Sequence, residues 1–352
     1  MRSFPDVPAT VERLLAGGER ERVGVVLLDA FGRRFLERHA DHPFLRRLTV
    51  TEIATQFPPT TTAHVTTMHT GRPVGEHGLY EWNIYEPALD AVVIPILHAG
   101  SAGGALPIDP ATFIDGPTLY ERLDVPSTVL HPSSFSPSTY DGVFTVGSRL
   151  QPYATFSDGV DGLFDALERG GYAYLYWDRI DLMGHLHGPA SPEFDAAAIA
   201  ALDALEAGLR EVPGALLLVT ADHGQVAVDP ARVDYLDELW PPLTGLLAQR
   251  PAGSSRDVFL HTHPGAASEV VAGLSERVDA DVRLVADMVA DGLFGEVGPR
   301  LRERLADVCV LPADGRTAWL RPYAGRPQSF LGHHGGLHRD EVDTWVGALD
   351  YS

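Results

Sequence analysis

Few folds can accommodate the three uninterrupted apolar runs of this chain, which are VGVVLL at 23–28, YAYLYW at 172–177 and ALLLV at 215–219. Runs of this kind are typical of parallel strands that are buried on both faces of a sheet. An aspartate follows each run within a few residues, and α/β proteins bind ligands at the carboxyl ends of such strands. The sequence therefore predicts an α/β protein with a mostly parallel central sheet sandwiched by helices, and a polar site at one edge of that sheet.

The intervening segments predict the remaining elements and two domains. Strands are expected at 48–55, 127–131 and 257–262, and helices at 10–16, 33–47, 62–70, 192–209 and 267–278. From residue 226 onward the chain becomes rich in Pro and Leu, and 321–330 is typical of a Pro/Gly linker. We therefore expect a core domain of 1–225 and 331–352, and a smaller inserted α+β lobe of 226–330.

Composition excludes several classes of partner. The net charge is −21, and every basic residue is an arginine. Such an acidic chain is poorly suited to wrapping nucleic-acid backbone or lying on an anionic membrane. No apolar run approaches the ~20 residues that span a bilayer, and the first residues lack the pattern of a signal peptide. The expected location is cytoplasmic, and the single Cys309 is expected to be a buried structural thiol.

The stretch at 57–78, FPPTTTAHVTTMHTGRPVGEHG, places a cluster of threonines behind two prolines. Because proline is excluded from helix interiors, a helix is expected to begin at the threonines. A hydroxyl at a helix N-terminus lies where free N–H groups favour a bound anion such as phosphate. Threonine is a weak nucleophile without an activator. Taken alone, the stretch is better explained as an N-cap before an ordinary helix.

Aspartates and histidines recur near the ends of the predicted strands and again near the end of the chain. An isolated residue of this kind is more often a helix cap, a turn or a surface residue than a ligand. Mixed Asp/His coordination suits Zn²⁺ or Mn²⁺. Two metals about 3.5–4 Å apart would deprotonate a threonine hydroxyl and stabilise the leaving oxygen. The candidate ligands are Asp29, Asp181, His185, Asp222, His223 and His334.

These pieces together resemble the alkaline phosphatase superfamily, and within it the type I phosphodiesterase/nucleotide pyrophosphatase family. The matching motifs are LLDAFG, the threonine stretch, DLMGH followed by HGP, TADHG and GHHGG, in the family's order. The resemblance implies an alkaline phosphatase-like fold. It also implies one zinc held by Asp181, His185 and His334, and a second held by Asp29, Asp222 and His223.

The resemblance further implies a nucleophile at Thr61, with Thr60 as the nearest competitor. Thr61 would also ligate the metals as its alkoxide and become a phosphothreonine intermediate. The implied reaction is metal-dependent hydrolysis of phosphodiester or phosphoanhydride bonds in a small phosphorylated substrate such as a nucleotide.

Substrate contacts are expected from Asn83, His64, Tyr80 and Trp82, with Tyr85 nearby. Asn83 is the counterpart of the family's phosphate-binding Asn, one residue later than the usual spacing. Ala63 and His64 replace the family's usual Pro-Asn after the nucleophile. The aromatic residues are more often packing than a surface for a flat group.

Alternatives within the superfamily remain open. A phosphomonoesterase or a phosphonate hydrolase would use the same two-metal core. A sulfatase would need a C/S-x-P-x-R motif, which Cys309 does not have, and a cofactor-independent phosphoglycerate mutase would use serine. A non-catalytic metal-binding module is the remaining alternative. Its degenerate site would lack ligands or the hydroxyl.

Overall fold

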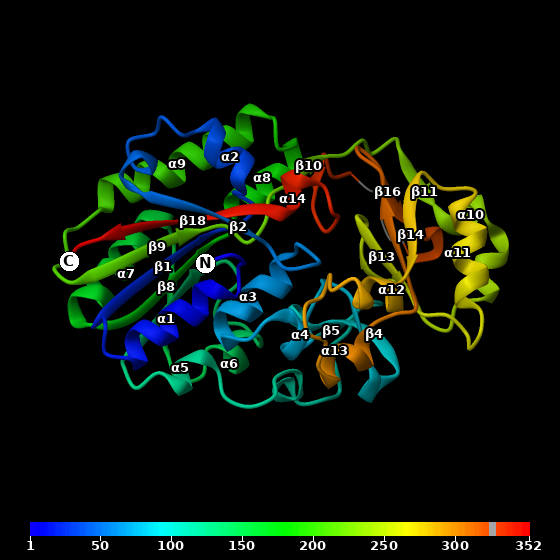
Figure 1. Ribbon diagram of the computed structural model, residues 1–352, viewed down its shortest axis with the longest axis horizontal. Coiled ribbons are helices and arrows are strands. Elements are labelled where there is room, and N and C mark those ends of the chain that lie inside the picture. The colour runs from blue at the N-terminus through cyan, green and yellow to red at the C-terminus, as the bar shows by residue number, and fades with distance from the viewer. Residues whose placement is uncertain (324–328) are drawn as a thin grey trace.

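A computed structural model describes residues 1–323 and 329–352, and its centre is a twisted sheet (Figure 1). In this described part the sheet has seven strands in the order β2-β18-β9-β1-β8-β6-β7. The five strands from β9 to β7 are parallel, while β18 runs antiparallel to both of its neighbours. The strands are β1 (Arg22–Leu28), β2 (Thr49–Ala54), β6 (Ser127–Pro132), β7 (Arg149–Tyr153), β8 (Gly171–Trp177), β9 (Ala215–Thr220) and β18 (Asp343–Asp350). The predicted fold class is confirmed.

The three apolar runs form the middle of this sheet. In β1, Val26 lies opposite Leu175 of β8 on one side and Val219 of β9 on the other. All three side chains are fully buried, because helices cover both faces of the sheet. The carboxyl ends of β1, β8 and β9 therefore lie side by side, which brings the polar residues after them to one edge.

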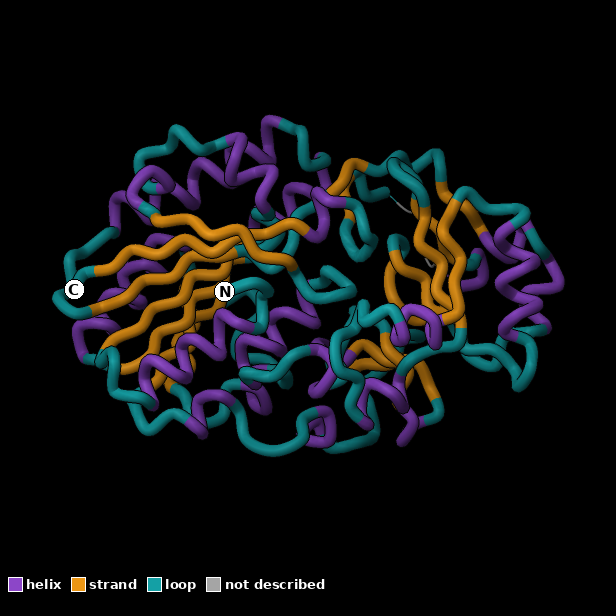
Figure 2. The backbone as a smooth tube through the Cα atoms, in the orientation of Figure 1, coloured by secondary structure: helices purple, strands orange, loops and turns teal. Residues whose placement is uncertain are grey.

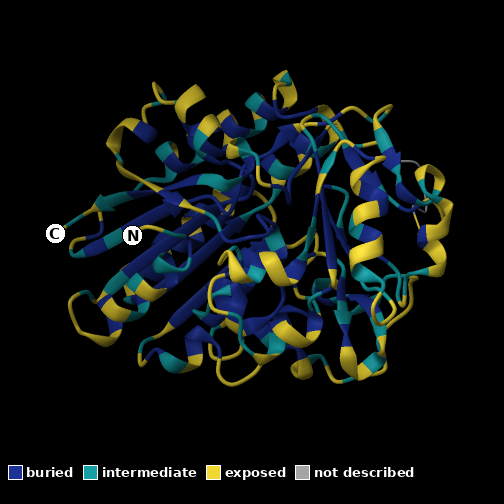
Figure 3. Ribbon diagram, turned by 45° about the vertical axis from the view of Figure 1, so that its right-hand side comes forward, coloured by how far each residue is buried: buried dark blue, intermediate teal, exposed yellow. Residues whose placement is uncertain are grey.

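Helices form a layer on each face of the sheet (Figures 1 and 2). One apolar core joins the sheet to α1, α3, α5 and α6, and a second joins it to α2, α7 and α9. Figure 3 shows the buried strands between helices whose outer faces are exposed. The helices of these layers are α1 (Asp6–Ala16), α2 (Arg33–Arg38), α3 (Thr61–Thr70), α5 (Leu119–Arg122), α6 (Asp141–Phe144), α7 (Phe156–Arg169), α8 (Arg179–His187) and α9 (Pro192–Gly208).

One prediction of local structure needs correction, and one strand has no counterpart among the predicted elements. The helix expected at 33–47 ends at Arg38, and only a short 3₁₀ turn at Leu45–Arg47 follows. Pro43 excludes a continuous helix over 33–47, because a proline in a helix interior lacks the N–H and clashes with the carbonyl four residues earlier, here that of His39. Strand β18 was not predicted at all, although it lies inside the sheet between β2 and β9.

In the described part of the chain, four small sheets and several short helices complete the fold. Within the segment expected to be a lobe, a separate apolar core gathers residues between Leu236 and Leu320. Other residues of that segment, including Phe259 and Leu301, belong to the first core of the central sheet. The division into two domains therefore stays a prediction, and residues 324–328 of the expected linker lie outside the described part.

The remaining elements are β3 (Ile84–Glu86), β4 (Ala91–Ile94), β5 (Ala99–Gly100), β10 (Val226–Ala227), β11 (Val233–Tyr235), β12 (Ala252–Ser254), β13 (Asp257–Leu260), β14 (Ala280–Leu284), β15 (Val308–Pro312), β16 (Thr317–Trp319), β17 (Gly332–His333), α4 (Val74–His77), α10 (Leu236–Leu239), α11 (Ala267–Ser275), α12 (Val285–Ala290), α13 (Pro299–Arg304) and α14 (Arg339–Val342). Cys309 is fully buried in β15, as expected. Among the described residues, no helix has the length and apolar character needed to cross a bilayer.

Candidate active site

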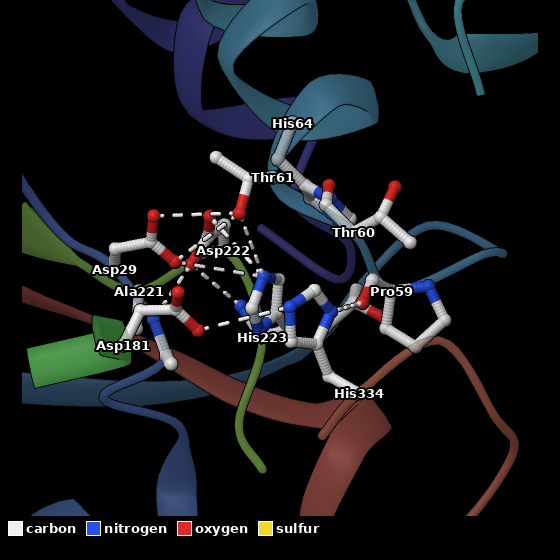
Figure 4. Close-up of polar contacts among 12 residues, drawn as sticks. Asp29, Pro59, Thr60, Thr61, His64, Asp181, Ala221, Asp222, His223 and His334 are labelled. Atoms are coloured by element: carbon white, nitrogen blue, oxygen red, sulfur yellow. Dashed lines mark hydrogen bonds and ion pairs between the residues drawn. The ribbon is translucent and has the colours of Figure 1, made fainter. Parts of the chain in front are cut away.

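The threonine cluster begins α3, and its two candidate hydroxyls point to different partners. Thr60 is the N-cap, with extended backbone, and its Oγ1 donates to the carbonyl oxygen of Tyr80 at 2.9 Å. Thr61 is the first residue of the helix, and its Oγ1 lies 3.3 Å from both Asp29 Oδ2 and His223 Nε2 (Figure 4). Thr61 therefore faces the polar cluster, while the Thr60 hydroxyl is used to hold the backbone.

One group of possible metal ligands consists of Asp29, Asp222 and His223, whose donor atoms all lie within 4.8 Å of one another. Asp29 follows β1, and Asp222 and His223 follow β9, so adjacent parallel strands deliver all three. Asp222 Oδ1 accepts from the N–H groups of Ala30 at 3.1 Å and His223 at 3.0 Å. Asp222 Oδ2 is buried without a hydrogen-bond partner, which leaves one lone-pair site for a cation.

A second group lies around Asp181 in α8. Its carboxylate is 3.3 Å from His185 Nε2 and 3.7 Å from His334 Nε2. Donor atoms of Asp181, His223 and His334 lie within 4.8 Å of one another, so His223 touches both groups. The rings of His223 and His334 stack with centroids 3.8 Å apart. All six predicted ligands are thus brought together with Thr61.

Backbone carbonyls orient the three histidines. Each Nδ1 is placed to donate to a carbonyl oxygen: His185 to Gly332 at 2.8 Å, His223 to Gly224 at 3.1 Å and His334 to Pro59 at 2.9 Å. Each Nε2 is therefore left with its lone pair facing the cluster. Metal-binding histidines are held in this way, because the outer hydrogen bond fixes the tautomer.

Burial and mutual repulsion make the metal-free cluster electrostatically unfavourable. Burial, followed by the charges of Asp222 and Asp181, raises the pKa of Asp29 well above its usual range. Burial likewise raises the pKa of Asp222 to about 7 and holds that of His334 well below its ordinary value. Burial also opposes ionisation of Asp181, but the nearby His185 and His334 hold its pKa at about 2. Bound cations would relieve this concentration of acidic groups.

A cavity of about 580 Å³ opens beside Thr61, a volume in the usual range for a small-molecule site. It is lined by Thr60, Thr61, Thr62, Glu81, Trp82, Asn83, Asp181, His185, Val233, Tyr235, Ser254, Ser255, Trp319, Phe330, His333 and His334. Two of the expected substrate residues, Trp82 and Asn83, are among them. The Asn83 side chain donates to the carbonyl oxygen of Gly253 at 3.0 Å, which fixes it at the cavity wall.

Two expected substrate residues do not reach the cavity. His64 is fully buried, with Nδ1 donating to Thr60 O at 2.7 Å and Nε2 accepting from Gln56 N at 3.0 Å. Both ring nitrogens are thus committed to backbone. Tyr80 is also fully buried, with its ring against Phe259 at 5.1 Å. Neither residue lines the cavity, because the helix and chain turns that carry them direct these side chains into the core.

Other residues of the site are not among those predicted from the sequence. Tyr176, inside the YAYLYW run, donates its hydroxyl to Asp29 Oδ2, and Gln225 donates to Asp181. Tyr176 lies two residues before Asp178, and its position near the end of a predicted strand is a signal that could have found it. Glu81 and the aromatic residues Tyr235, Trp319 and Phe330 carry no such signal, because only the folded chain brings them to the cavity.

Comparison with known proteins agrees with this geometry. The family model described as type I phosphodiesterase / nucleotide pyrophosphatase matches residues 23–336. Among solved structures, murine ectonucleotide pyrophosphatase / phosphodiesterase 5, as an inactive variant in complex with AMP, is 18% identical with a TM-score of 0.69. That alignment covers 93% of this chain and 87% of the murine chain.

Phosphonoacetate hydrolase from Sinorhizobium meliloti, in complex with phosphonoacetate, is also 18% identical with a TM-score of 0.69. Here the alignment covers 94% of this chain and 90% of the hydrolase. At this identity the structural likeness establishes the fold alone. No curated protein sequence matches the chain.

Proposed function

Because the chain belongs to the type I phosphodiesterase / nucleotide pyrophosphatase family, we propose that it hydrolyses phosphodiester or phosphoanhydride bonds of a small phosphorylated substrate. In this proposal Thr61 is the nucleophile and two divalent metal ions bind beside it. The observation that supports it most is the position of Thr61 Oγ1, 3.3 Å from both Asp29 and His223.

The donor set fits two divalent cations. Asp29, Asp222 and His223 would hold one, and Asp181, His185 and His334 would hold the other. Support comes from the unpartnered Asp222 Oδ2 and from the inward-facing Nε2 atoms. Mixed carboxylate and imidazole donors favour Zn²⁺, with Mn²⁺ as the alternative. When bound, the ions would supply positive charge that favours the ionised Thr61 hydroxyl and stabilises the departing oxygen.

Thr61 performs the first half of the reaction. Its Oγ1 attacks phosphorus, the bond from phosphorus to the leaving oxygen breaks, and Thr61 carries the phosphate, still esterified to the rest of the substrate, as a phosphothreonine ester. The Thr61 hydroxyl gives its proton to solvent, and the leaving oxygen takes up a proton from solvent. At the start of α3, the free N–H groups of the first turn favour the negative phosphoryl oxygens.

Water completes the second half. It attacks phosphorus of the phosphothreonine, the bond to Thr61 Oγ1 breaks, and the threonine regains a proton. The network from Asp29 to Tyr176 and from Asp181 to Gln225 keeps the polar groups in place through both steps. The chain is therefore proposed to be a metal-dependent hydrolase with a covalent intermediate.

The test compares hydrolysis of bis-p-nitrophenyl phosphate with that of p-nitrophenyl phosphate, each before chelation, after chelation and after reloading with zinc. We expect the diester to be preferred, the activity to be lost on chelation, and zinc to restore it. Preference for the monoester would overturn the diester assignment. Absence of hydrolysis of either ester after reloading with Zn²⁺ or Mn²⁺ would contradict the proposed reaction.

Phosphonate hydrolysis is the second candidate, because the phosphonoacetate hydrolase fold matches this chain as well as the phosphodiesterase fold does. Release of inorganic phosphate from phosphonoacetate by the zinc-loaded protein, at a rate above that for the diester, would favour it.

A further inference from the structure

Two side chains outside the proposed ligand set donate hydrogen bonds to carboxylates of the proposed metal sites. The first site consists of Asp29, Asp222 and His223, and the second site consists of Asp181, His185 and His334. The Tyr176 hydroxyl donates to Asp29 Oδ2, and the Gln225 amide donates to Asp181 Oδ1. Both donors are uncharged, so each can orient a carboxylate without cancelling the negative charge that attracts a cation. Each site therefore has one donor of its own.

Strand pairing places the Tyr176 hydroxyl beside Asp29. Strands β8 and β1 are parallel neighbours, and the N–H of Asp29 donates to the carbonyl oxygen of Trp177 at 2.9 Å. The Tyr176 ring is 7% exposed and packs edge-on against His131 with centroids 5.9 Å apart. Because Asp29 Oδ2 is bound to Tyr176, Asp29 Oδ1 is the oxygen that faces His223 Nε2, at 3.5 Å. The hydroxyl thus fixes which carboxylate oxygen is directed at the other ligands.

The fold leaves a fitted space for the Gln225 amide. Gln225 is fully buried, and its Nε2 also donates to the backbone carbonyl oxygen of Asp181 at 3.1 Å. A Cβ at Gly184 of α8 would lie 2.0 Å from Gln225 Oε1, and a Cβ at Gly332 of β17 would lie 2.8 Å from the same oxygen. A side chain at Gly184 would therefore displace the amide. The glycine of the DLMGH motif provides the room that this amide occupies.

Glutamine at position 225 carries a cost that its donor end explains. Gln225 Oε1 is buried without a hydrogen-bond partner among the described residues, and an unpaired buried acceptor is destabilising. Rotating the amide would not remove this cost, because Oε1 would then face two oxygens of Asp181, which are also acceptors. Methionine would fill a similar volume without an unpaired polar atom. We therefore attribute glutamine here to the hydrogen bond that it donates to Asp181.

Resting on the proposed function, we propose that Tyr176 and Gln225 are positioning residues that set the metal affinities of the two sites separately. Tyr176 acts on the first site and Gln225 acts on the second. Each donor holds one carboxylate in a fixed orientation, so its loss lets that carboxylate rotate away from the other ligands of its site. Hydrogen bonds of this kind contribute about 10- to 100-fold to metal affinity.

Zinc binding to chains with a single intact site tests this separation without turnover. His185→Gln removes a ligand from the second site, and Asp222→Asn removes one from the first. Zinc affinity is then measured in each background by competition with a chromogenic chelator. In His185→Gln we expect Tyr176→Phe to weaken zinc binding by at least about tenfold and Gln225→Met to leave it unchanged. In Asp222→Asn we expect the opposite result.

The chain with all six ligands provides a second measurement, which does not depend on the two ligand variants. After dialysis against the chelator, elemental analysis should find less zinc in Tyr176→Phe and in Gln225→Met than in wild type, and the double variant should lose the sum of the two losses. Circular dichroism of the metal-free proteins checks that each variant is folded.

A double-mutant cycle tests the space around the amide. Gly184→Ala should weaken zinc binding at the second site as much as Gln225→Met does, because the added Cβ displaces the amide. In Gln225→Ala, where that space is empty, Gly184→Ala should cost little further affinity. Additive losses would contradict the role given to the glycine.

Equal effects of each variant on both sites, or no effect of either variant, would overturn the separate roles of Tyr176 and Gln225. Site-specific weakening of zinc binding in a protein that hydrolyses no phosphate ester would support these roles and contradict only the proposed reaction.

Discussion

At the scale of single residues, the site depends on how two adjacent threonines divide their roles. Thr60 and Thr61 have nearly the same chemistry, but the N-cap geometry directs one hydroxyl to the Tyr80 carbonyl and the other to Asp29 and His223. Only a hydroxyl in contact with the ligand cluster can be ionised by bound cations. Thr61 is therefore the proposed nucleophile, and Thr60 is not.

Replacing each threonine separately tests this assignment. Thr61→Ala should lower kcat for the diester by at least about a thousandfold, as expected for the loss of a nucleophile, while elemental analysis finds the metal content retained. Thr60→Ala is the matched control and should mainly lower the melting temperature, because it removes a buried hydrogen bond. If Thr61→Ala keeps wild-type kcat and Thr60→Ala does not, the assignment is wrong.

At the scale of elements, α3 is fixed to the sheet by a buried histidine as well as by apolar packing. His64 bridges the first turn of the helix to the backbone of Gln56, and both of its ring nitrogens are used. Burial lowers the pKa of His64 to about 4, so the folded protein keeps this ring neutral at pH values where the unfolded chain protonates it.

Because the folded protein keeps His64 neutral, acid should lower the free energy of unfolding. In the unfolded chain His64 has an ordinary pKa of about 6.5. Below that pH the unfolded state binds more protons than the folded state, so the free energy of unfolding falls as the pH falls. The fall ends where the folded ring itself titrates, at about pH 4. From pH 7 to pH 5 the free energy of unfolding falls by about 2 kcal/mol because of His64. Urea unfolding at pH 7 and pH 5, after chelation, measures this loss in wild type and in His64→Gln. The loss in free energy of unfolding should be smaller in the variant by that amount. Equal losses in the two proteins would mean that His64 is not the group responsible.

The sequence predicts well those elements whose formation depends on a few neighbouring residues. The apolar runs, the serine cap of α9 and the proline–threonine start of α3 can all be read within a few neighbouring residues. Strand β18 cannot, because its sequence DTWVGALD is interrupted by Gly347 and flanked by acids, and its burial comes from pairing with β2 and β9. In the same way, the six ligands follow recognisable motifs, whereas Glu81 and Asp257 are 176 positions apart and meet only in the fold.

At the scale of the whole molecule, the cavity lies where residues of 226–330 meet the strand edge of the central sheet. A buried ion pair joins these parts: Arg256 Nη2 lies 2.9 Å from Glu341 Oε2, and both side chains are at most 2% exposed. Arg256 also donates to the carbonyl oxygens of Pro312, Ala313 and Arg316. The pair therefore fixes the cavity wall relative to the ligand cluster.

Breaking this pair should destabilise the protein strongly. Glu341→Gln leaves the Arg256 charge buried without its counter-ion, and we expect a loss of about 3–5 kcal/mol in the free energy of unfolding. The exposed pair of Arg339 and Asp343 is the matched control, so Arg339→Gln should change stability little. Denaturant unfolding of the three proteins measures the difference. A loss no larger for Glu341→Gln than for Arg339→Gln would show that the buried pair does not hold the two parts together.

The central claim, that hydrolysis proceeds through Thr61, is tested most directly by the stereochemistry at phosphorus. A p-nitrophenyl phosphorothioate diester of one configuration is hydrolysed by the zinc-loaded protein in ¹⁸O-labelled water, and the configuration of the product is determined. Two successive in-line displacements, first by Thr61 and then by water, predict overall retention of configuration. Inversion would mean that water attacks the substrate in a single step, which would contradict the phosphothreonine intermediate.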